Sequence, residues 1–427
     1  MAEEITAAMK QWSLDDLVEK SGTAQTKTEK ALNWGRPGYL TKSDLDVYVK
    51  FRDEVEKRGG EFKNTVYSFT EVEGEVYTLT RWLRARKYVL ADTIKMVEEA
   101  TGERAVPRAV DYYPDAEAAL GVDPSIFISQ YPQLYSGFSK DGCPVFYSKP
   151  GILNIDGIEC MTTIDGILKF HWHVMQHDYK KRLLQFKKDN PSFTRFECVS
   201  ILDLSGLAAS NLNSRTLDII KKQAFIDSLC FPETMNKMLV VNAPRFFSAT
   251  WGIIKGFVDA RTAAKIEVVS SSSAAQKKLK EIIDVDQIPS DYGGTAESTH
   301  VTLAKDAAVN ADKGGRSRLK AEVMYVRSYL SWKFQMKEDE EADIWVYTRA
   351  KTGATFTISD ASTKKPLAPP VVIKHNVSKD DDNTNPTNGQ ITTQRISGVS
   401  EVKVKAENLK SRMSSESYLV VVNIYKK

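Results

Sequence analysis

The sequence has few cysteines and no long apolar run, and these absences exclude several classes of protein. Its 427 residues include only four cysteines, which are far apart and form no CxxC pair, so neither a zinc knuckle nor a disulfide framework is indicated. The longest purely apolar runs have the length of a strand, so no transmembrane helix is predicted. The residues after Met1 show no apolar core of a signal peptide. We therefore expect a cytoplasmic protein that associates with membranes only peripherally.

The motifs of common enzymes are also missing. The chain has no GxSxG elbow, no P-loop and no GxGxxG fingerprint, which mark many hydrolases, nucleoside triphosphatases and dinucleotide enzymes. His173 and His177 are spaced to share a helix face, but no HExxH motif or third ligand group accompanies them. A formal net charge of +3 is too small to indicate a nucleic-acid-binding protein. We predict no catalysis, no metal or other cofactor, and no nucleic-acid partner.

Composition and length indicate a globular protein with more than one domain. Hydrophobic residues make up 42% and charged residues 27% of the chain, as in typical globular proteins. At about 100 to 200 residues per domain, the chain has room for two or three. We divide it into an N-terminal arm (1–35), a helical region (36–120), an α/β domain (121–298), a linker (299–318) and a β-rich domain (319–427).

Strand and helix patterns alternate through the middle of the chain. Strand-like apolar runs and helical patterns follow one another at 198–204, 214–230, 237–243, 246–258, 265–270 and 274–283. Continuous apolar strands joined by helices predict a parallel sheet, buried on both faces, with right-handed crossovers. Before it, the Asp141-Gly142 turn predicts a pair of strands, and apolar residues at helical spacing predict a long helix over about 163–186.

The C-terminal region has a different pattern. Short segments are separated by glycine, proline or polar turns, and several alternate apolar with polar residues; they are LSWKFQM, DIWVY, ATFTIS, PPVVI, EVKVK and YLVVVNIY. Such segments over about 100 residues predict an antiparallel β-sandwich. The fold class is therefore α/β, with an N-terminal helical region and a mixed, largely parallel sheet, followed by an all-β antiparallel sandwich.

One segment, residues 246–258, is too apolar for an ordinary surface helix. Its apolar residues fall on nearly every side of a helix, so other apolar groups must pack against both sides of that helix to keep it out of water. About thirteen residues are too few to cross a bilayer, which leaves a core helix or the wall of an apolar cavity. Ser248, Gly252 and Gly256 form a stripe of small residues. Glycine inside a helix indicates close packing or a segment that bends.

Two groups of polar residues suit an anionic partner. One follows the apolar segment and consists of Arg261, Thr262 and Lys265. The other lies in a helix predicted at about 76–87 and consists of Arg81, Arg84, Arg86 and Lys87. Their donors can make charge-assisted hydrogen bonds to an anionic headgroup. The more ordinary interpretation of the second group is a solvated basic face on an amphipathic helix.

Five blocks carry a resemblance to a known family. In order, they are LTRWLRARKY (79–88), YPQLYSGFSKDGCPVF (131–146), ILDLSG (201–206), NAPRFFSATWGIIKGFVDARTAAKI (242–266) and IPSDYGG (288–294). Together they resemble the CRAL-TRIO lipid-transfer family, in particular the yeast phosphatidylinositol/phosphatidylcholine transfer proteins, over about 36–298. The C-terminal region resembles a GOLD domain in its strand pattern. Supernatant protein factor and the patellins join the same two modules.

The resemblance implies a lid that swings to admit lipid. The lid and acyl-pocket residues are Phe246, Phe247, Trp251, Gly252, Ile254, Gly256 and Phe257. The residues implied to hold the phosphate of phosphatidylinositol are Arg86, Lys87, Thr262 and Lys265. The family's phosphatidylcholine contacts match Tyr135 and Ser210. Ala208 and Phe146, however, replace an expected serine and tyrosine, so the resemblance supports phosphatidylinositol more strongly than phosphatidylcholine.

The expected function is therefore that of a non-enzymatic carrier. It would hold one phospholipid and exchange it at a membrane surface, with any protein partner bound to the C-terminal β-sandwich. One alternative is a carrier of another hydrophobe, such as tocopherol or a sterol precursor. A second is a membrane-trafficking adaptor in which the GOLD-like domain is the functional end and the lipid is structural.

Overall fold

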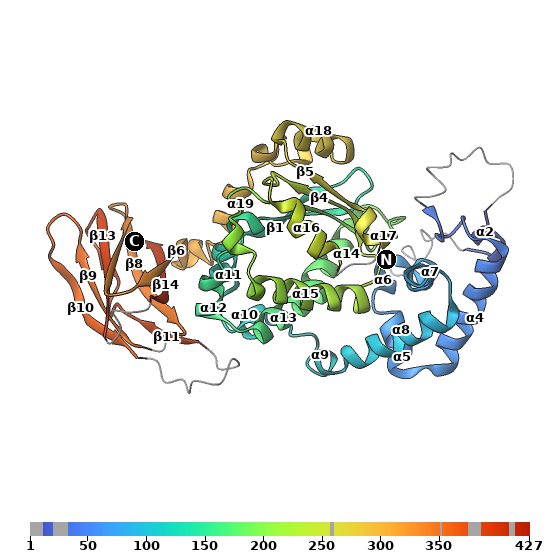
Figure 1. Cartoon of the computed structure of the whole chain (residues 1–427), viewed down its shortest axis with the longest axis horizontal. Helices are drawn as coiled ribbons and strands as arrows, with labels where there is room; N and C mark the ends of the chain where they lie inside the picture. The colour runs from blue at the N-terminus through green and yellow to red at the C-terminus, as the bar shows by residue number, and fades with distance from the viewer. Residues whose placement is uncertain (1–11, 20–32, 257–259, 351, 375–385, 410–414) are drawn as a thin grey trace.

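The computed structural model describes residues 12–19, 33–256, 260–350, 352–374, 386–409 and 415–427. Three parts follow one another along the long axis of the molecule (Figure 1). Helices form the N-terminal part, a sheet covered by helices forms the central part, and a β-sandwich forms the part at the other end. Both outer parts contact the central one.

The N-terminal part consists of helices packed around aromatic residues. They are α2 (Leu14–Leu17), α4 (Lys42–Arg58), α5 (Gly60–Val66), α6 (Thr70–Glu73), α7 (Glu75–Ala85), α8 (Leu90–Glu103) and α9 (Ala105–Ala109). Trp82 of α7 is fully buried, and its indole N–H donates to the carbonyl of Val66 at 3.2 Å. The predicted helix at about 76–87 is confirmed as α7.

The central sheet has the strand order β1-β2-β3-β4-β5. Its strands are β1 (Gln133–Phe138), β2 (Pro144–Ser148), β3 (Cys198–Asp203), β4 (Met235–Val241) and β5 (Ile266–Val269). β1 pairs with β2 in antiparallel fashion, whereas β2 to β5 run parallel. The predicted strand pair and parallel sheet are both confirmed.

Helices connect and flank these strands. They are α10 (Ala116–Leu120), α11 (Pro124–Gln130), α12 (Ile155–Met161), α13 (Ile164–His173), α14 (Lys180–Asp189), α15 (Ser214–Cys230), α16 (Phe247–Lys255), α17 (Ala260–Ala264), α18 (Ser272–Ile282) and α19 (Thr299–Asp306). The long helix predicted over 163–186 is present but not regular, because a π-helical turn, Val174–Tyr179, joins α13 to α14. Apolar spacing does not distinguish such a turn from regular helix.

The two faces of the sheet are covered by different helices. On one face, Val199 and Ile201 of β3 pack with Leu279 of α18. Side chains alternate along a strand, so the neighbouring Leu202 points to the other face. There it joins a cluster that includes Phe247 of α16. α16 and α18 therefore lie on opposite faces of the sheet (Figure 1).

The C-terminal part is the predicted antiparallel sandwich. One sheet has the order β10 (Pro366–Ile373), β9 (Ala354–Asp360), β13 (Glu401–Asn408), β7 (Tyr329–Gln335). The other has the order β11 (Thr387–Gln390), β8 (Glu340–Thr348), β14 (Glu416–Lys426), β6 (Arg316–Val326), with β12 (Ile396–Ser397) beside β8. The two inner faces enclose a separate apolar core.

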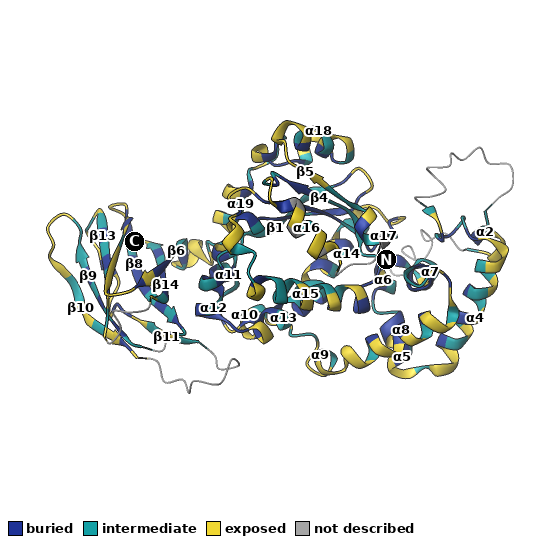
Figure 2. Ribbon diagram, viewed as in Figure 1, coloured by how far each residue is buried: buried dark blue, intermediate teal, exposed yellow. Residues whose placement is uncertain are grey.

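The sandwich packs against the central part through an apolar interface. Leu419 and Val421 of β14 belong to the same buried cluster as Phe127 of α11 and Ile158 of α12. Val420, between them, points into the core of the sandwich. β14 is therefore buried on both faces (Figure 2).

The predicted linker, residues 299–318, contains regular structure. α19 and the first residues of β6 lie within it. Thr299 is fully buried; its hydroxyl accepts a hydrogen bond from Lys149 Nζ at 2.7 Å, and its backbone N–H donates to Asp291 at 3.0 Å. Leu303 is the apolar residue of α19 that packs against the core on the α18 face of the sheet. One such contact, with the polar contacts of Thr299, gives no apolar periodicity that would have revealed this helix.

Candidate functional site

α16, the helix of the predicted lid, covers part of the sheet face opposite α18. Phe247 is only 5% exposed and packs with Leu204 and Val240. Trp251, one turn later, contacts the same cluster. One side of α16 is therefore apolar and faces the sheet.

The predicted lid is partly described. Phe257 and the side chain of Ile254 lie outside the described residues. Among the described residues, a Cβ added at Gly252 would meet no atom within 4 Å, and one added at Gly256 would meet the carbonyl of Ile253, at 3.2 Å. The described residues therefore show no close packing around Gly252, and a segment that bends stays a prediction.

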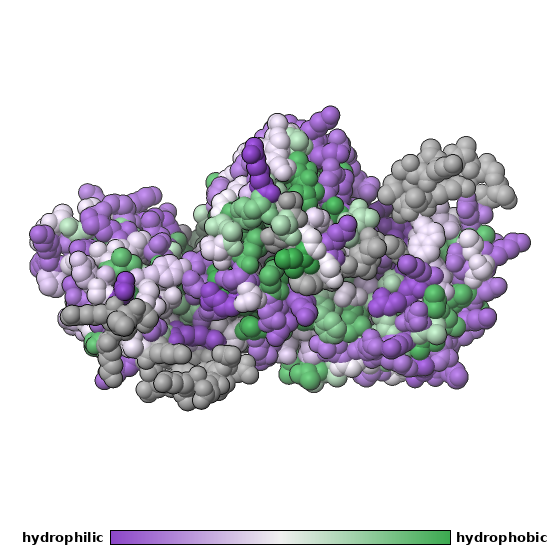
Figure 3. All heavy atoms as spheres, in the orientation of Figure 1, coloured by the Kyte–Doolittle hydropathy of each residue, from purple (hydrophilic) through white to green (hydrophobic). Residues whose placement is uncertain are grey.

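Large apolar side chains stand exposed at the start of α16, on α16 and on α15. Phe246, at the start of α16, is 39% exposed, Ile253 of α16 is 54% exposed, and Phe225 of α15 is 55% exposed. In Figure 3, hydrophobic residues gather in the region where Figure 1 places α16. α16, the helix of the predicted lid, thus has a second apolar side, which faces solvent.

The strand residues under α16 are also incompletely covered. Leu202, Met238 and Ile266 pack against the α16 cluster but are only half-buried. Strands of a parallel sheet are normally buried on both faces. This face of the sheet therefore keeps apolar surface that an apolar ligand could cover.

Lys265 and Arg84 meet at one carboxylate. Lys265 Nζ lies 3.3 Å from Glu233 Oε2 and donates to the carbonyl of Met235 at 2.8 Å. Arg84 Nη2 lies 3.2 Å from the same oxygen of Glu233. Glu233 has a left-handed backbone with φ of 61°, a sparsely populated conformation that concentrates at functional sites. These contacts join the end of α7 to the amino ends of β4 and β5.

A second buried carboxylate, Glu197, lies directly before β3. Arg36 and Arg195 donate to its two oxygens, the latter at 3.2 Å, and Asn236 donates at 2.9 Å. Burial alone would raise the pKa of Glu197, but the charges of Arg36 and Arg195 outweigh burial and lower it. Glu197 and Glu233 were not among the residues predicted from the sequence. The sequence feature that could have indicated them is that Glu197 directly precedes the apolar strand β3, and Glu233 lies two residues before the apolar strand β4.

The solvated interpretation of the basic stripe is wrong for two of its members. Arg81 and Arg84 are only 5% and 7% exposed. Arg81 Nε pairs with Glu73 at 2.9 Å, whereas Arg84 pairs with Glu233 as described above. A buried charge is costly unless it is paired, so these two glutamates are what allow the arginines to face inward.

Arg86 and Lys87 form the turn that follows α7. Arg86 is half-buried and Lys87 is exposed. Lys87 and Tyr88 have left-handed φ values of 51° and 60°. Because Arg84 and Lys265 share one carboxylate, the turn that starts two residues after Arg84 lies at the same edge of the sheet as Lys265.

The other predicted headgroup residues lie in different places. Thr262 is half-buried in α17, three residues before Lys265, and the side chain of Arg261 lies outside the described residues. Tyr135 lies on β1, where burial raises its pKa well above the ordinary value. Ser210 is exposed in a short 3₁₀ helix, Ala209–Asn211, beyond the carboxyl end of β3, whereas Lys265 precedes the amino end of β5. The structure thus groups Thr262 with Lys265 and separates Ser210 from them.

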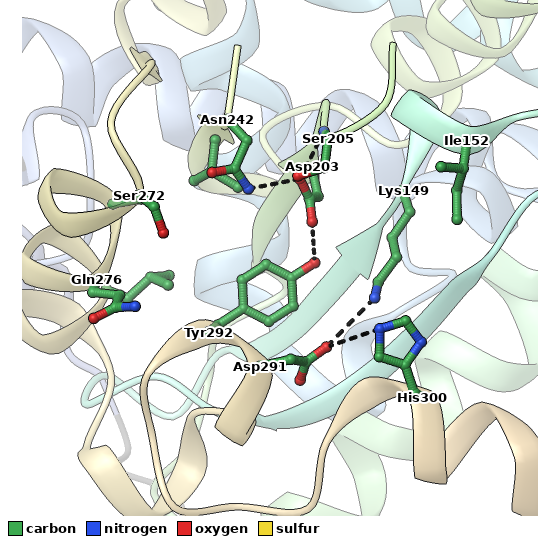
Figure 4. A pocket seen from close by; sticks show the side chains of 13 residues that line it. Lys149, Ile152, Asp203, Ser205, Asn242, Ser272, Gln276, Asp291, Tyr292 and His300 are labelled. Atoms are coloured by element: carbon green, nitrogen blue, oxygen red, sulfur yellow. Dashed lines mark hydrogen bonds and ion pairs between the residues drawn. The ribbon is translucent and has the colours of Figure 1, made fainter.

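A polar cavity of about 410 Å³ lies beside α18, at the carboxyl ends of β3 and β4 (Figure 4). Its charged groups all have polar partners within the cavity wall. Lys149 Nζ lies 3.4 Å from the carboxylate of Asp291, and Asp203 accepts hydrogen bonds from Tyr292 and Asn242, each at 2.8 Å. Acyl chains placed here would desolvate these groups, so this cavity does not suit a lipid tail.

His173 and His177 each hydrogen-bond to a backbone carbonyl. His173 Nδ1 lies 2.7 Å from the carbonyl of Tyr113, and His177 Nε2 lies 2.8 Å from that of Asp111. From Asp111 to Tyr113 the backbone is left-handed, with φ between 49° and 59°. Within the described ranges, no group of three His, Cys, Asp or Glu residues could hold a metal ion.

The helices give no membrane span. Among the residues that the structure describes, no helix is both long enough and apolar enough to cross a bilayer.

Comparison with known proteins identifies the central domain. The family model described as "CRAL/TRIO domain" matches residues 128–294, so the chain contains this domain. The matched stretch includes the whole central sheet, α16, Glu233 and Lys265. This part of the resemblance is confirmed. The C-terminal region is all-β as predicted, while its assignment to the GOLD family stays a prediction.

Several proteins of known name are similar to this chain. "Phosphatidylinositol/phosphatidylcholine transfer protein SFH12" of Arabidopsis thaliana is 28% identical over 235 residues, 53% of this chain and 40% of that protein. "SEC14 cytosolic factor" of Candida glabrata is 28% identical over 269 residues, 62% of this chain and 82% of that protein. The crystal structure of Sfh5 aligns with a TM-score of 0.40 and 17% identity, over 51% of this chain and 71% of that one. The chain spans less than half the length of its plant relatives.

Proposed function

We propose that this chain, which carries a CRAL/TRIO domain, binds one phospholipid and transfers it between membranes, with phosphatidylinositol as its main ligand. The observation that carries the proposal is the cluster of Arg84, Lys265 and Glu233 at the edge of a sheet whose lid-side face is only half covered. A phosphodiester bears a full negative charge. Once it leaves water it needs charge-assisted donors, each worth about 1.5 to 3 kcal/mol. The printed names of similar proteins point to the same class of lipid.

The energetics favour exchange over extraction. A diacyl lipid has about thirty methylenes, and burying each is worth about 0.8 kcal/mol. The bilayer offers nearly the same environment, so the two terms almost cancel. The net preference then depends on headgroup contacts and on the cost of leaving the apolar face exposed to water. The protein should therefore leave a membrane only when it carries a lipid.

Lipid extraction from the purified protein tests this function. We expect mass spectrometry to find one phospholipid per chain, mainly phosphatidylinositol, because an empty apolar face is costly in water. Transfer between vesicles should require lipid in the acceptor and no nucleotide or metal ion. Lipid-free protein that is monodisperse, with a Tm unchanged by phosphatidylinositol, would contradict the proposal and favour the adaptor function. Finding tocopherol or a sterol precursor instead would favour the alternative carrier.

We further propose that the exposed side of the lid contacts membranes. Phe246 and Ile253 are its exposed apolar residues, and Arg245 and Lys255 on the same segment would favour anionic bilayers. Phe247 packs toward the sheet, so it is a poor probe of membrane contact.

Ile253→Asp should slow vesicle-to-vesicle transfer about tenfold or more, since placing isoleucine at the interface is worth roughly 1.5 to 3 kcal/mol. Lipid already bound should be retained. Val301→Asp is the control, because Val301 is similarly exposed, at 46%, but lies on α19. Equal loss of retention and transfer in Ile253→Asp would mean that α16 is fixed core and not a moving lid.

The proposal also extends to the role of the C-terminal sandwich and to the cellular compartment in which the protein acts. We propose that the sandwich is a GOLD-like domain and that a protein partner would bind its outer surface, where Tyr329 and Leu330 are 67% and 39% exposed. The protein would act in the cytoplasm and associate with membranes transiently, without a cofactor and without catalysis.

A further inference from the structure

The N-terminal arm reaches the basic turn that follows α7. We infer that residues 33–40, called here the arm segment, position Arg86 and Lys87 for the inositol phospholipid and so help to set headgroup selectivity. The inference rests on the proposed function. It concerns residues that act through their neighbours, since the arm segment would shape the turn without itself binding the phosphate.

The arm segment is fixed at its far end by α2. Leu17 and Leu40 are 1% and 0% exposed. The backbone N–H groups of Gly38 and Leu40 both donate to the carbonyl of Leu17, at 2.9 and 3.1 Å. These two hydrogen bonds and the buried leucines tie residues 38–40 to α2 and to the core of the N-terminal part.

At its near end, the arm segment contacts both sides of the basic turn. Tyr88, which ends the turn and is 6% exposed, donates its hydroxyl hydrogen to the carbonyl of Gly35 at 2.6 Å. The ring of Trp34 packs edge-on against Tyr88, with centroids 5.9 Å apart. A Cβ added at Gly35 would lie 2.8 Å from Tyr88 Cε2 and 2.9 Å from Arg84 Cγ. Only glycine allows the arm backbone to approach the turn this closely.

The next residue ties the arm segment to the sheet. Arg36 donates to Glu197, directly before β3, and Glu197 accepts from Asn236 of β4. The arm segment therefore bridges the turn and the strand ends that lie beside Lys265. It holds the two sides of the proposed headgroup site relative to each other.

The turn needs such support. Lys87 and Tyr88 both have left-handed backbones, which L-residues adopt rarely and keep only when the surroundings hold them. Charge-assisted hydrogen bonds to a phosphate depend on placing the donors within about 0.5 Å. Loss of the Tyr88 contact would free the turn and misplace Arg86 and Lys87, while the apolar face that takes the acyl chains would be unchanged.

Tyr88→Phe tests the inference and has a matched control. It removes the hydroxyl that reaches Gly35 and keeps the ring. Tyr418→Phe removes an equivalent bond, since buried Tyr418 donates to the carbonyl of Thr352 at 2.8 Å inside the sandwich. Each full-length protein would be incubated with phosphatidylcholine vesicles that contain phosphatidylinositol, re-isolated, and analysed for bound lipids by mass spectrometry.

We expect the ratio of bound phosphatidylinositol to bound phosphatidylcholine to fall about two- to tenfold in Tyr88→Phe, as for the loss of one hydrogen bond. The ratio should be unchanged in Tyr418→Phe, although Tm should fall in both. A structural role alone would lower Tm without moving the ratio. An unchanged ratio in Tyr88→Phe would therefore overturn the inference.

Gly35→Ala and Gly38→Ala form a second pair. Both glycines are left-handed, with φ of 67° and 87°, so both substitutions strain the backbone. Among the described residues, a Cβ at Gly38 would meet the carbonyl of Asp16 alone, at 3.8 Å. Gly35→Ala should lower phosphatidylinositol uptake more than Gly38→Ala does, and equal uptake would count against the inference. If Gly35→Ala does not fold, the comparison of Tyr88→Phe with Tyr418→Phe tests the inference instead.

Different results would contradict the proposed function and the role of the arm segment. Wild-type protein that takes up no phosphatidylinositol would contradict the proposed function, and the inference with it. Wild-type protein that takes it up, with Tyr88→Phe and Tyr418→Phe giving equal lipid ratios, would contradict the inference alone.

Discussion

Lys265→Ala is expected to lower phosphatidylinositol uptake about tenfold to a hundredfold. The substitution removes one charge-assisted donor, and a hydrogen bond to a charged group contributes about 1.5 to 3 kcal/mol. Lys265 lies at the polar edge of the sheet and its side chain is 24% exposed, so the fold should remain intact. The measurement is lipid uptake from mixed vesicles, with circular dichroism to confirm folding.

Lys278→Ala provides the control for this prediction. Lys278 also pairs with a glutamate, Glu267, at 3.3 Å, and its side chain is 37% exposed, but it lies on α18 on the other face of the sheet. The Lys278→Ala protein should take up phosphatidylinositol and phosphatidylcholine as the wild-type protein does. If Lys265→Ala lost phosphatidylinositol and phosphatidylcholine equally while folded, the assignment of Lys265 to the inositol headgroup would be wrong.

Leu419→Asp should destabilise the whole protein and not the sandwich alone. Leu419 is fully buried at the interface between β14 and the helices α11 and α12. Removing a buried leucine costs about 2 to 5 kcal/mol, and a buried unpaired carboxylate adds to that cost. We expect Tm to fall by about 10 °C or more, or little soluble protein to be recovered.

Val372→Asp is the comparison for Leu419→Asp. Val372 lies on β10 in the other sheet of the sandwich and is 45% exposed, so a carboxylate there stays in water. Its Tm should change by no more than a few degrees. A Leu419→Asp protein as stable as Val372→Asp would show that the interface contributes little, and the sandwich would then be an independent module.

Periodicity was sufficient to predict the elements that build the site. Continuous apolar runs at 198–204 and 237–243 predicted strands of a parallel sheet, and β3 and β4 are such strands, although their face under α16 is only partly covered. The run YLVVVNIY likewise predicted a strand, now β14. An apolar run indicates that both faces of a strand are covered but does not identify the cover, so the contact of β14 with α11 and α12 could not be foreseen.

The ion network at the site could not be predicted because its partners are distant in sequence. Arg36 and Glu197 are 161 residues apart, and only the fold brings them together. Three-residue spacing correctly placed Arg81 and Arg84 on one face of α7. Whether that face is solvated depends on what packs against it, and the presence of Glu73 and Glu233 there made the solvated interpretation wrong. The headgroup roles of Arg86, Lys87 and Thr262 stay predictions.

The two-sided burial of β14 has a consequence for the order of events during synthesis. The helices α11 and α12 emerge from the ribosome long before the strand that covers them; Cys160 and its hydrogen-bond partner Ser417 are 257 residues apart. At about 5 to 20 residues per second, the ribosome needs roughly 13 to 50 seconds to make that stretch. During this time the apolar surface around Ile158 has no partner strand. The nascent chain should therefore depend on a chaperone for longer than its central domain alone would.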